Sequence, residues 1–239
     1  MTMLVPELVK CAVCGKGNQV MVMNSTSRFG TCDLDTRPPA MFRFTMFLQS
    51  CMHCGYVNHD ITEGDNSIQE FLETELYQTC DGINPADETA KHFIQYAIIQ
   101  AHSKVESILN DTDSGSTQEN ILMGFLNAAW ACDDCAKADP KYEKYKQDAI
   151  ECRKRCLGLI DSIITKQQDS GHKETMLGIK ADLLRRTGQF EAVISEYENK
   201  VFENPYVDQV IRFEIDLAKD KDTKTYNMQD IDQVKYPLK

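Results

Sequence analysis

The chain has 239 residues, of which 26 are Lys or Arg, 37 are Asp or Glu and ten are Cys, and its net charge is −11. Apolar residues make up 42% of the sequence and aromatic residues 8%, which excludes collagen, a low-complexity tail and wholesale disorder. The length predicts one large domain or two modest ones.

The apolar stretches are short, and the first ten residues lack the basic flank and long apolar core of a signal peptide. We therefore expect no membrane span and a cytoplasmic location. In that reducing compartment, cysteines are thiols or metal ligands rather than disulfides.

The negative charge is unevenly distributed. Residues 1–60 carry five basic and four acidic residues, a net of +1, so the remainder carries −12. An acidic body repels a phosphate backbone, because affinity for nucleic acid comes largely from Lys and Arg. DNA or RNA binding is therefore disfavoured.

The first 60 residues predict a small β region. Gln19–Met23 is typical of a strand, and Met41–Gln49 alternates apolar and other residues with the period of a half-buried strand. Between them, Asn24–Ala40 is irregular, because Gly30 and two prolines break both helix and strand.

After about Gly64 the apolar period becomes helical. We expect a mostly α fold with a small N-terminal β zinc ribbon, divided into residues 1–64 and a helical, TPR-like domain of residues 65–239. Seven helices are predicted, at Ser67–Thr79, from Asn84-Pro85 to about residue 109, and at Glu119–Lys137, Lys141–Lys166, Lys173–Arg186, Phe190–Phe202 and Pro205–Lys219.

Residues 174–207 resemble a single tetratricopeptide (TPR) repeat, a pair of antiparallel helices. Ala181 stands at the small position of the first helix, Gly188 in the turn, Tyr197 at the aromatic position of the second helix and Pro205 at its end. The resemblance implies stacked helical hairpins; Val193 and Lys200 depart from the pattern, which has alanine at both positions. A generic helical hairpin is the alternative.

Two Cys-x-x-Cys-Gly motifs are the strongest chemical signal. Cys11 and Cys14 form one pair, and Cys51 and Cys54 the other. Four thiolates suit a tetrahedral structural zinc ion, and the glycine lets the backbone turn so that amides face the sulfurs. We predict one structural zinc ion on these four residues, with rubredoxin-like iron as the alternative.

A second set, Cys132, Cys135, Cys152 and Cys156, lies on two predicted helices joined near Asp139-Pro140. The pairs are offset by roughly 10 Å along the hairpin, so their sulfurs cannot converge on one ion. We interpret them as core cysteines. Cys32 and Cys80 have no partner in the sequence pattern and no assigned role.

Two loops are candidate binding sites. Asp111–Gly115 begins like a calcium loop but lacks its later acidic ligands, so calcium is not expected. In the other loop, Asp33, Asp35 and Arg37 alternate in an extended stretch fixed by two prolines. It is either a structural loop, with Arg37 paired to a carboxylate of the helical domain, or a small recognition site.

The run from Gly30 to Tyr56, with the earlier Cys-Ala-Val-Cys-Gly, resembles a bacterial family of uncharacterised proteins that pairs such a cysteine region with a TPR-like helical part. The resemblance extends to Ala128-Ala129-Trp130 and to Leu183–Gly188. It implies a bacterial, cytoplasmic, metal-binding protein and implies no activity.

No motif of a metalloprotease, serine hydrolase, P-loop or dinucleotide-binding protein occurs, so catalysis has no support in the sequence. The first hypothesis is therefore a non-enzymatic module that binds a protein or peptide. The alternatives are a redox or iron protein and, less favoured, a nucleic-acid-associated ribbon factor. A partner-binding surface is predicted on the helices, where basic residues would favour an acidic peptide or a C-terminal carboxylate; these residues are Lys173, Lys180, Arg185 and Arg186.

Overall fold

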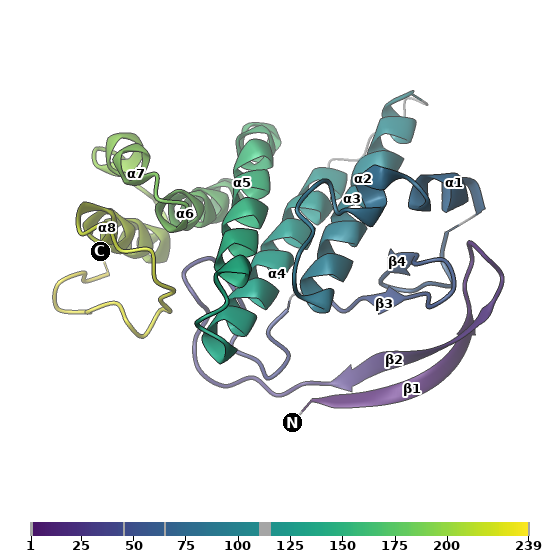
Figure 1. Cartoon of the computed structure of the whole chain (residues 1–239). Helices are drawn as coiled ribbons and strands as arrows, with labels where there is room; N and C mark the ends of the chain where they lie inside the picture. The colour runs from purple at the N-terminus through teal and green to yellow at the C-terminus, as the bar shows by residue number, and fades with distance from the viewer. Residues whose placement is uncertain (1, 45, 65, 110–115, 239) are drawn as a thin grey trace. The chain divides into compact units, whose positions relative to one another are not determined.

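The computed structural model describes residues 2–44, 46–64, 66–109 and 116–238 (Figure 1). The candidate calcium loop at residues 111–115 lies outside this range. The chain forms two compact units: unit 1 contains residues 1–27 and 40–152, and unit 2 contains residues 28–39 and 153–239. The predicted boundary between residues 64 and 65 does not coincide with this division and stays a prediction about independently folding domains.

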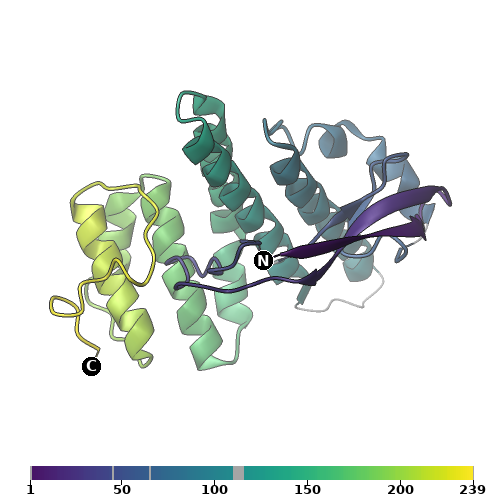
Figure 2. The same cartoon turned by 90° about the horizontal axis from the view of Figure 1, so that it is seen from below.

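The fold is mostly helical, as predicted, with helices over 51% of the chain. The described strands form two antiparallel pairs in unit 1, β1 (Met3–Lys10) with β2 (Gly17–Ser25), and β3 (Gln49–Ser50) with β4 (Val57–Asn58). Figures 1 and 2 both show β1 and β2 as one long twisted ribbon. The Gln19–Met23 strand is confirmed within β2; β1 was not predicted.

The predicted strand at Met41–Gln49 is wrong: apart from Gln49, its described residues are not in a strand. Its aromatic rings form a cluster instead. The ring centroid of Phe42 lies 5.4 Å from those of both Phe44 and Phe47, and Phe44 lies 5.0 Å from Phe93. In an extended strand Phe42 and Phe47 would point to opposite faces, so the contact between them requires the chain to bend.

The helices of unit 1 begin with short segments: the 3-10 helix η1 (Asn66–Ile68), α1 (Gln69–Leu72) and α2 (Glu75–Gln78). They replace the single predicted helix at Ser67–Thr79, because Thr74 is extended and caps α2 by accepting a hydrogen bond from the backbone N–H of Tyr77.

The next helix, α3 (Glu88–Leu109), begins later than predicted. Asn84 has a left-handed φ of 47° and is not its cap; Asp87 instead accepts from the N–H of Ala90 at 2.8 Å. Helices α3 and α4 (Ser116–Ala138) pack closely along their lengths. A side chain at Gly124 would lie 2.8 Å from the Cβ of Ala97, so the glycine permits this approach.

Helix α5 (Glu143–Lys166) follows the predicted turn at Asp139-Pro140. The helices α6 (Ser170–Arg186), α7 (Phe190–Tyr197) and α8 (Pro205–Lys219) lie side by side in unit 2 (Figures 1 and 2). Helix α6 starts three residues earlier than predicted, because Asp169 caps it, and α7 ends five residues earlier. The predicted bounds of α8 are confirmed, with Asn204 as its cap.

The turn between α6 and α7 is a Schellman motif. The N–H of Gly188 donates to Arg185 and that of Gln189 donates to Leu184, while Gly188 has a φ of +79°. Ala181, Val193 and Tyr197 are buried in the core that α6, α7 and α8 share. These are features of a helical hairpin, and they lie in the segment that resembles a TPR repeat.

A second core in unit 2 lies between α8 and the C-terminal segment, and includes Leu34 from the excursion at residues 28–39. The N–H of Leu34 donates to the carbonyl of Tyr226, and the N–H of Met228 donates to that of Cys32, both at 3.0 Å. Residues 220–238 therefore pack against α8 and residues 32–34 without forming a helix or a strand.

Within the part of the chain that is described, no helix combines the length and the apolar character needed to cross a membrane.

Candidate metal centre

Each Cys-x-x-Cys-Gly motif forms the turn of a β-hairpin. We call the turn Cys11–Lys16, between β1 and β2, knuckle 1, and the turn Cys51–Tyr56, between β3 and β4, knuckle 2. The strand register ends at Lys10 opposite Gly17 in the first hairpin and at Ser50 opposite Val57 in the second.

The two knuckles have the same backbone hydrogen bonds. The N–H of the first cysteine donates to the residue five positions on, at 3.0 Å in knuckle 1 and 2.8 Å in knuckle 2. The glycine N–H donates back to the first cysteine at 2.9 Å in both, and Gly15 and Gly55 have φ of 70° and 74°. The glycines are thus required by the turn, as their place after each motif predicted.

These turns bring the four predicted ligands together. The sulfurs of Cys11, Cys14, Cys51 and Cys54 all lie within 4.8 Å of one another. The Sγ–Sγ distance is 3.8 Å from Cys11 to Cys54 and 3.6 Å from Cys14 to Cys51. Four sulfurs about 2.3 Å from one zinc ion at tetrahedral corners lie about 3.8 Å apart. The cluster therefore has the size of a four-thiolate metal site.

The surroundings of the four thiols shift their pKa values in different directions. Burial opposes ionisation of Cys51, but N–H···S hydrogen bonds from knuckle 2, including that of His53 at 3.4 Å, outweigh it and lower the pKa of Cys51 to about 6. Burial, together with the neighbouring sulfurs, raises the pKa of Cys54, and burial raises that of Cys11. Four adjacent thiolates repel one another, and a cation is what would hold them all ionised.

Side chains from elsewhere in unit 1 support the knuckles. The buried Asn18 accepts from the N–H of Met52 at 3.0 Å and donates to the carbonyl of Lys16 at 2.9 Å, so it ties one knuckle to the other. Tyr77 of α2 is fully buried, and its hydroxyl donates to the carbonyl of Gly55 at 2.6 Å. The backbone N–H of Ala12 donates to Ile61 at 2.8 Å.

Sequence reasoning missed Asn18 and Tyr77. Asn18 lies two residues after knuckle 1 ends, and a side-chain amide so close to the motif could have been predicted to support it. Tyr77 lies 22 residues beyond Gly55 and on a different element, so spacing alone carried no signal for it.

The remaining cysteines are not gathered into a second centre, since the four-cysteine cluster is the one group of metal-binding side chains found among the described residues. Cys132, Cys152 and Cys156 are fully buried, and burial raises the pKa of Cys132 and Cys156. The interpretation as core cysteines is consistent with the burial of these three, whereas Cys135 is only half-buried and its Sγ donates to Asp87 at 3.2 Å. Cys80 is also buried, whereas Cys32 is exposed.

The candidate recognition loop lies largely inside unit 2. Asp35 and Arg37 are each only 1% exposed and Asp33 is 7% exposed. The N–H of Arg37 donates to a carboxylate oxygen of Asp35 at 3.3 Å, and Asp35 lies 4.0 Å from the guanidinium of Arg186. This burial favours the structural interpretation of the loop over the recognition site.

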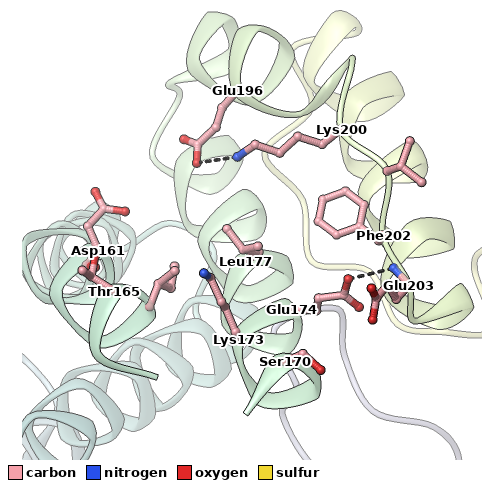
Figure 3. Close-up of a pocket in the computed structure, with 12 residues that line it drawn as sticks. Asp161, Thr165, Ser170, Lys173, Glu174, Leu177, Glu196, Lys200, Phe202 and Glu203 are labelled. Atoms are coloured by element: carbon pink, nitrogen blue, oxygen red, sulfur yellow. Dashed lines mark hydrogen bonds and ion pairs between the residues drawn. The ribbon is translucent and has the colours of Figure 1, made fainter. Parts of the chain in front are cut away.

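The four basic residues predicted to bind a partner have different surroundings. Arg185 is fully buried and bonded to Asp182 and Glu214, and Arg186 is 9% exposed. Lys180 forms ion pairs with Asp161 at 2.8 Å and Glu196 at 2.9 Å. Lys173 is exposed and lines a groove (Figure 3). The structure therefore does not gather these four on one accessible face.

No protein-family model, curated protein or solved structure matches the chain. The resemblance to a bacterial cysteine-and-TPR family thus gains no support from a family model. Of the features that this resemblance implies, the structure has the close group of four cysteines and the mostly helical fold.

Proposed function

We propose that the protein is a non-enzymatic module in which a structural zinc ion, held by Cys11, Cys14, Cys51 and Cys54, supports a helical, TPR-like body that binds a protein partner. The observation that carries the metal site is the set of Sγ–Sγ distances, which match a zinc tetrahedron.

A structural role is favoured over a catalytic one by the donor set. Four protein thiolates complete a tetrahedron and leave no position for water or substrate, which catalytic zinc requires. The ligands also sit on hairpin turns braced by Asn18 and Tyr77, so the ion would link two hairpins and the start of the helical region. Zinc binding at such a site contributes directly to folding free energy.

The partner-binding role is supported by the shape of unit 2. Helices α6, α7 and α8 stack side by side and leave a groove beside α5 and α6. Stacked helical hairpins commonly present such surfaces to peptides. The net charge of −11 disfavours nucleic acid as the partner.

Metal analysis of freshly purified protein tests the metal site. We expect about one zinc per chain, lost in a Cys14→Ser variant and retained in a Cys32→Ser variant, because Cys32 is an exposed cysteine outside the cluster. Less than half an equivalent of any metal would refute the site. Iron in place of zinc, with visible thiolate-to-iron absorption, would favour the rubredoxin-like alternative.

A further inference from the structure

The α5–α7 groove is a surface hollow within unit 2 with a volume of about 640 Å³, formed by the end of α5, the start of α6, the end of α7 and the α7–α8 loop (Figure 3). This volume lies in the range of pockets that bury several side-chain-sized groups. Its apolar part comes from Ile164, Leu177 and Phe202. At its edge Val201 is 91% exposed, so its surface is available to a partner.

Every wall of the groove carries a carboxylate. Asp161 comes from α5, Glu174 from α6, Glu196 from α7 and Glu203 from the α7–α8 loop. The basic residues that line it are Lys173 and Lys200. Lys180 pairs with two of the four carboxylates and adds a third positive charge, so the groove with its ion pairs carries a net charge of −1.

Three of these four carboxylates also hold the walls of the groove together. Lys180 connects Asp161 to Glu196, and so ties α5 to α7. Glu174 accepts from the backbone N–H groups of Glu203 and Asn204, at 2.7 and 2.8 Å, and so holds the α7–α8 loop (Figure 3).

The carboxylate of Glu203 has no hydrogen bond or ion pair with another described residue, and Asp161 keeps 70% of its side chain exposed. These two groups can meet a cation from outside, whereas Arg185 and Lys180, which would have attracted an acidic peptide, are respectively buried and neutralised. Lys173, Lys180 and Lys200 reduce the negative charge of the groove without reversing it.

The charge of the whole chain argues against a second copy as the occupant. Unit 1 has 9 basic and 20 acidic residues, and unit 2 has 17 of each, so the units carry −11 and 0. A second copy would therefore present a strongly acidic or a neutral body to an acidic groove. The net charge of neither unit complements the groove, which favours a different protein as the source of the positive charge.

We propose that the α5–α7 groove binds an extended segment of another protein in which a large apolar side chain is flanked by Lys or Arg. The apolar side chain lies against Leu177, Phe202 and Val201, and the basic side chain lies against Glu203 and Asp161. This inference rests on the proposed partner-binding role of unit 2, and it reverses the sign of the acidic peptide expected from the sequence.

The test is selection of a random displayed-peptide library on the full-length, metal-loaded protein. We expect enriched peptides to carry Lys or Arg next to a large apolar residue. Absence of enrichment, or enrichment of acidic peptides or free C-terminal carboxylates, would overturn the proposal. Zinc measured in the same preparation separates this failure from failure of the metal site.

Three variants locate the binding. With the most enriched peptide as a labelled probe, Glu203→Lys is expected to weaken affinity about fivefold, because it replaces an exposed attraction with a repulsion. Val201→Ser should weaken it about tenfold through lost apolar contact. Glu191→Lys makes the same charge change on an exposed position of α7 outside the groove and should leave affinity unchanged.

Both groove residues are exposed, so these substitutions are not expected to unfold the protein. If the probe binds Glu203→Lys and Val201→Ser as tightly as the unmodified protein, the peptide site lies elsewhere and the proposal is wrong. Equal weakening by Glu191→Lys would show a general charge effect and would also overturn it.

Discussion

Replacing Tyr77 by Phe tests whether the helices support the metal centre. Tyr77 is fully buried, and its hydroxyl donates to the carbonyl of Gly55, the residue that follows the ligand Cys54. The substitution removes this one oxygen and preserves the ring, so it leaves the Gly55 carbonyl without its partner while changing little of the packing.

Leaving a buried acceptor without its hydrogen bond costs about 1–3 kcal/mol. If the bond forms fully only when the knuckle is closed around the ion, a loss of about 2 kcal/mol weakens zinc binding roughly thirtyfold. Groups that orient metal ligands from the next layer typically change metal affinity by about 10–100-fold, which agrees with this figure.

The assay is competition for zinc with a chromogenic chelator, together with thermal unfolding of the zinc-loaded protein. We expect Tyr77→Phe to lower both zinc affinity and unfolding temperature. Tyr206→Phe is the control, because Tyr206 is 59% exposed and far less constrained by its surroundings. Zinc affinity equal to that of the control variant would refute the coupling of α2 to knuckle 2.

Three further outcomes are expected. Chelation of the metal, or Cys14→Ser, should destabilise α1–α4 along with the hairpins, because both belong to unit 1; hydrogen exchange that changes in the hairpins alone would contradict this. Gly188→Ala should lower the free energy of unfolding by about 1–3 kcal/mol, measured by denaturant titration, because a side chain there is strained at φ +79° but meets no atom within 4 Å. Arg185→Leu should cost about 3–5 kcal/mol in the same assay by leaving Glu214 and Asp182 buried without their partner, and adding Glu214→Leu should restore part of it; a double variant as unstable as the single one would contradict this account.

The metal ligands could be predicted from the sequence because their geometry is local. Each Cys-x-x-Cys-Gly turn closes on itself through hydrogen bonds that span at most five residues, so the motif contains most of the information that shapes it. The same holds for the start of α8 at Pro205 and the Gly188 turn, where a residue type fixes the backbone.

The sequence predicted the wrong secondary structure where contacts between residues distant in the sequence outweigh the local preference for a helix or a strand. The run at Met41–Gln49 alternates like a strand, but its phenylalanines meet one another and Phe93 of α3. Asn84-Pro85 has the composition of a helix start, yet the N–H of Ala86 is taken by the buried carboxylate of Asp148 on α5, and the helix begins at Glu88. Neither contact can be inferred from spacing.

The division of the chain into two units does not follow the order of the residues along the sequence. Residues 28–39 lie between the two knuckles in sequence, yet they belong to unit 2, where Leu34 is 4% exposed among Val210, Leu217 and Ile231. A fragment that began at residue 65 would lose this side chain and both backbone hydrogen bonds to the C-terminal segment. Burial of one leucine is worth about 1.5–3 kcal/mol, a substantial share of the stability of a small domain. Because unit 2 includes residues that the sequence pattern assigns to the ribbon, we expect a fragment that begins at residue 65 to be less stable than the same helices in the full chain.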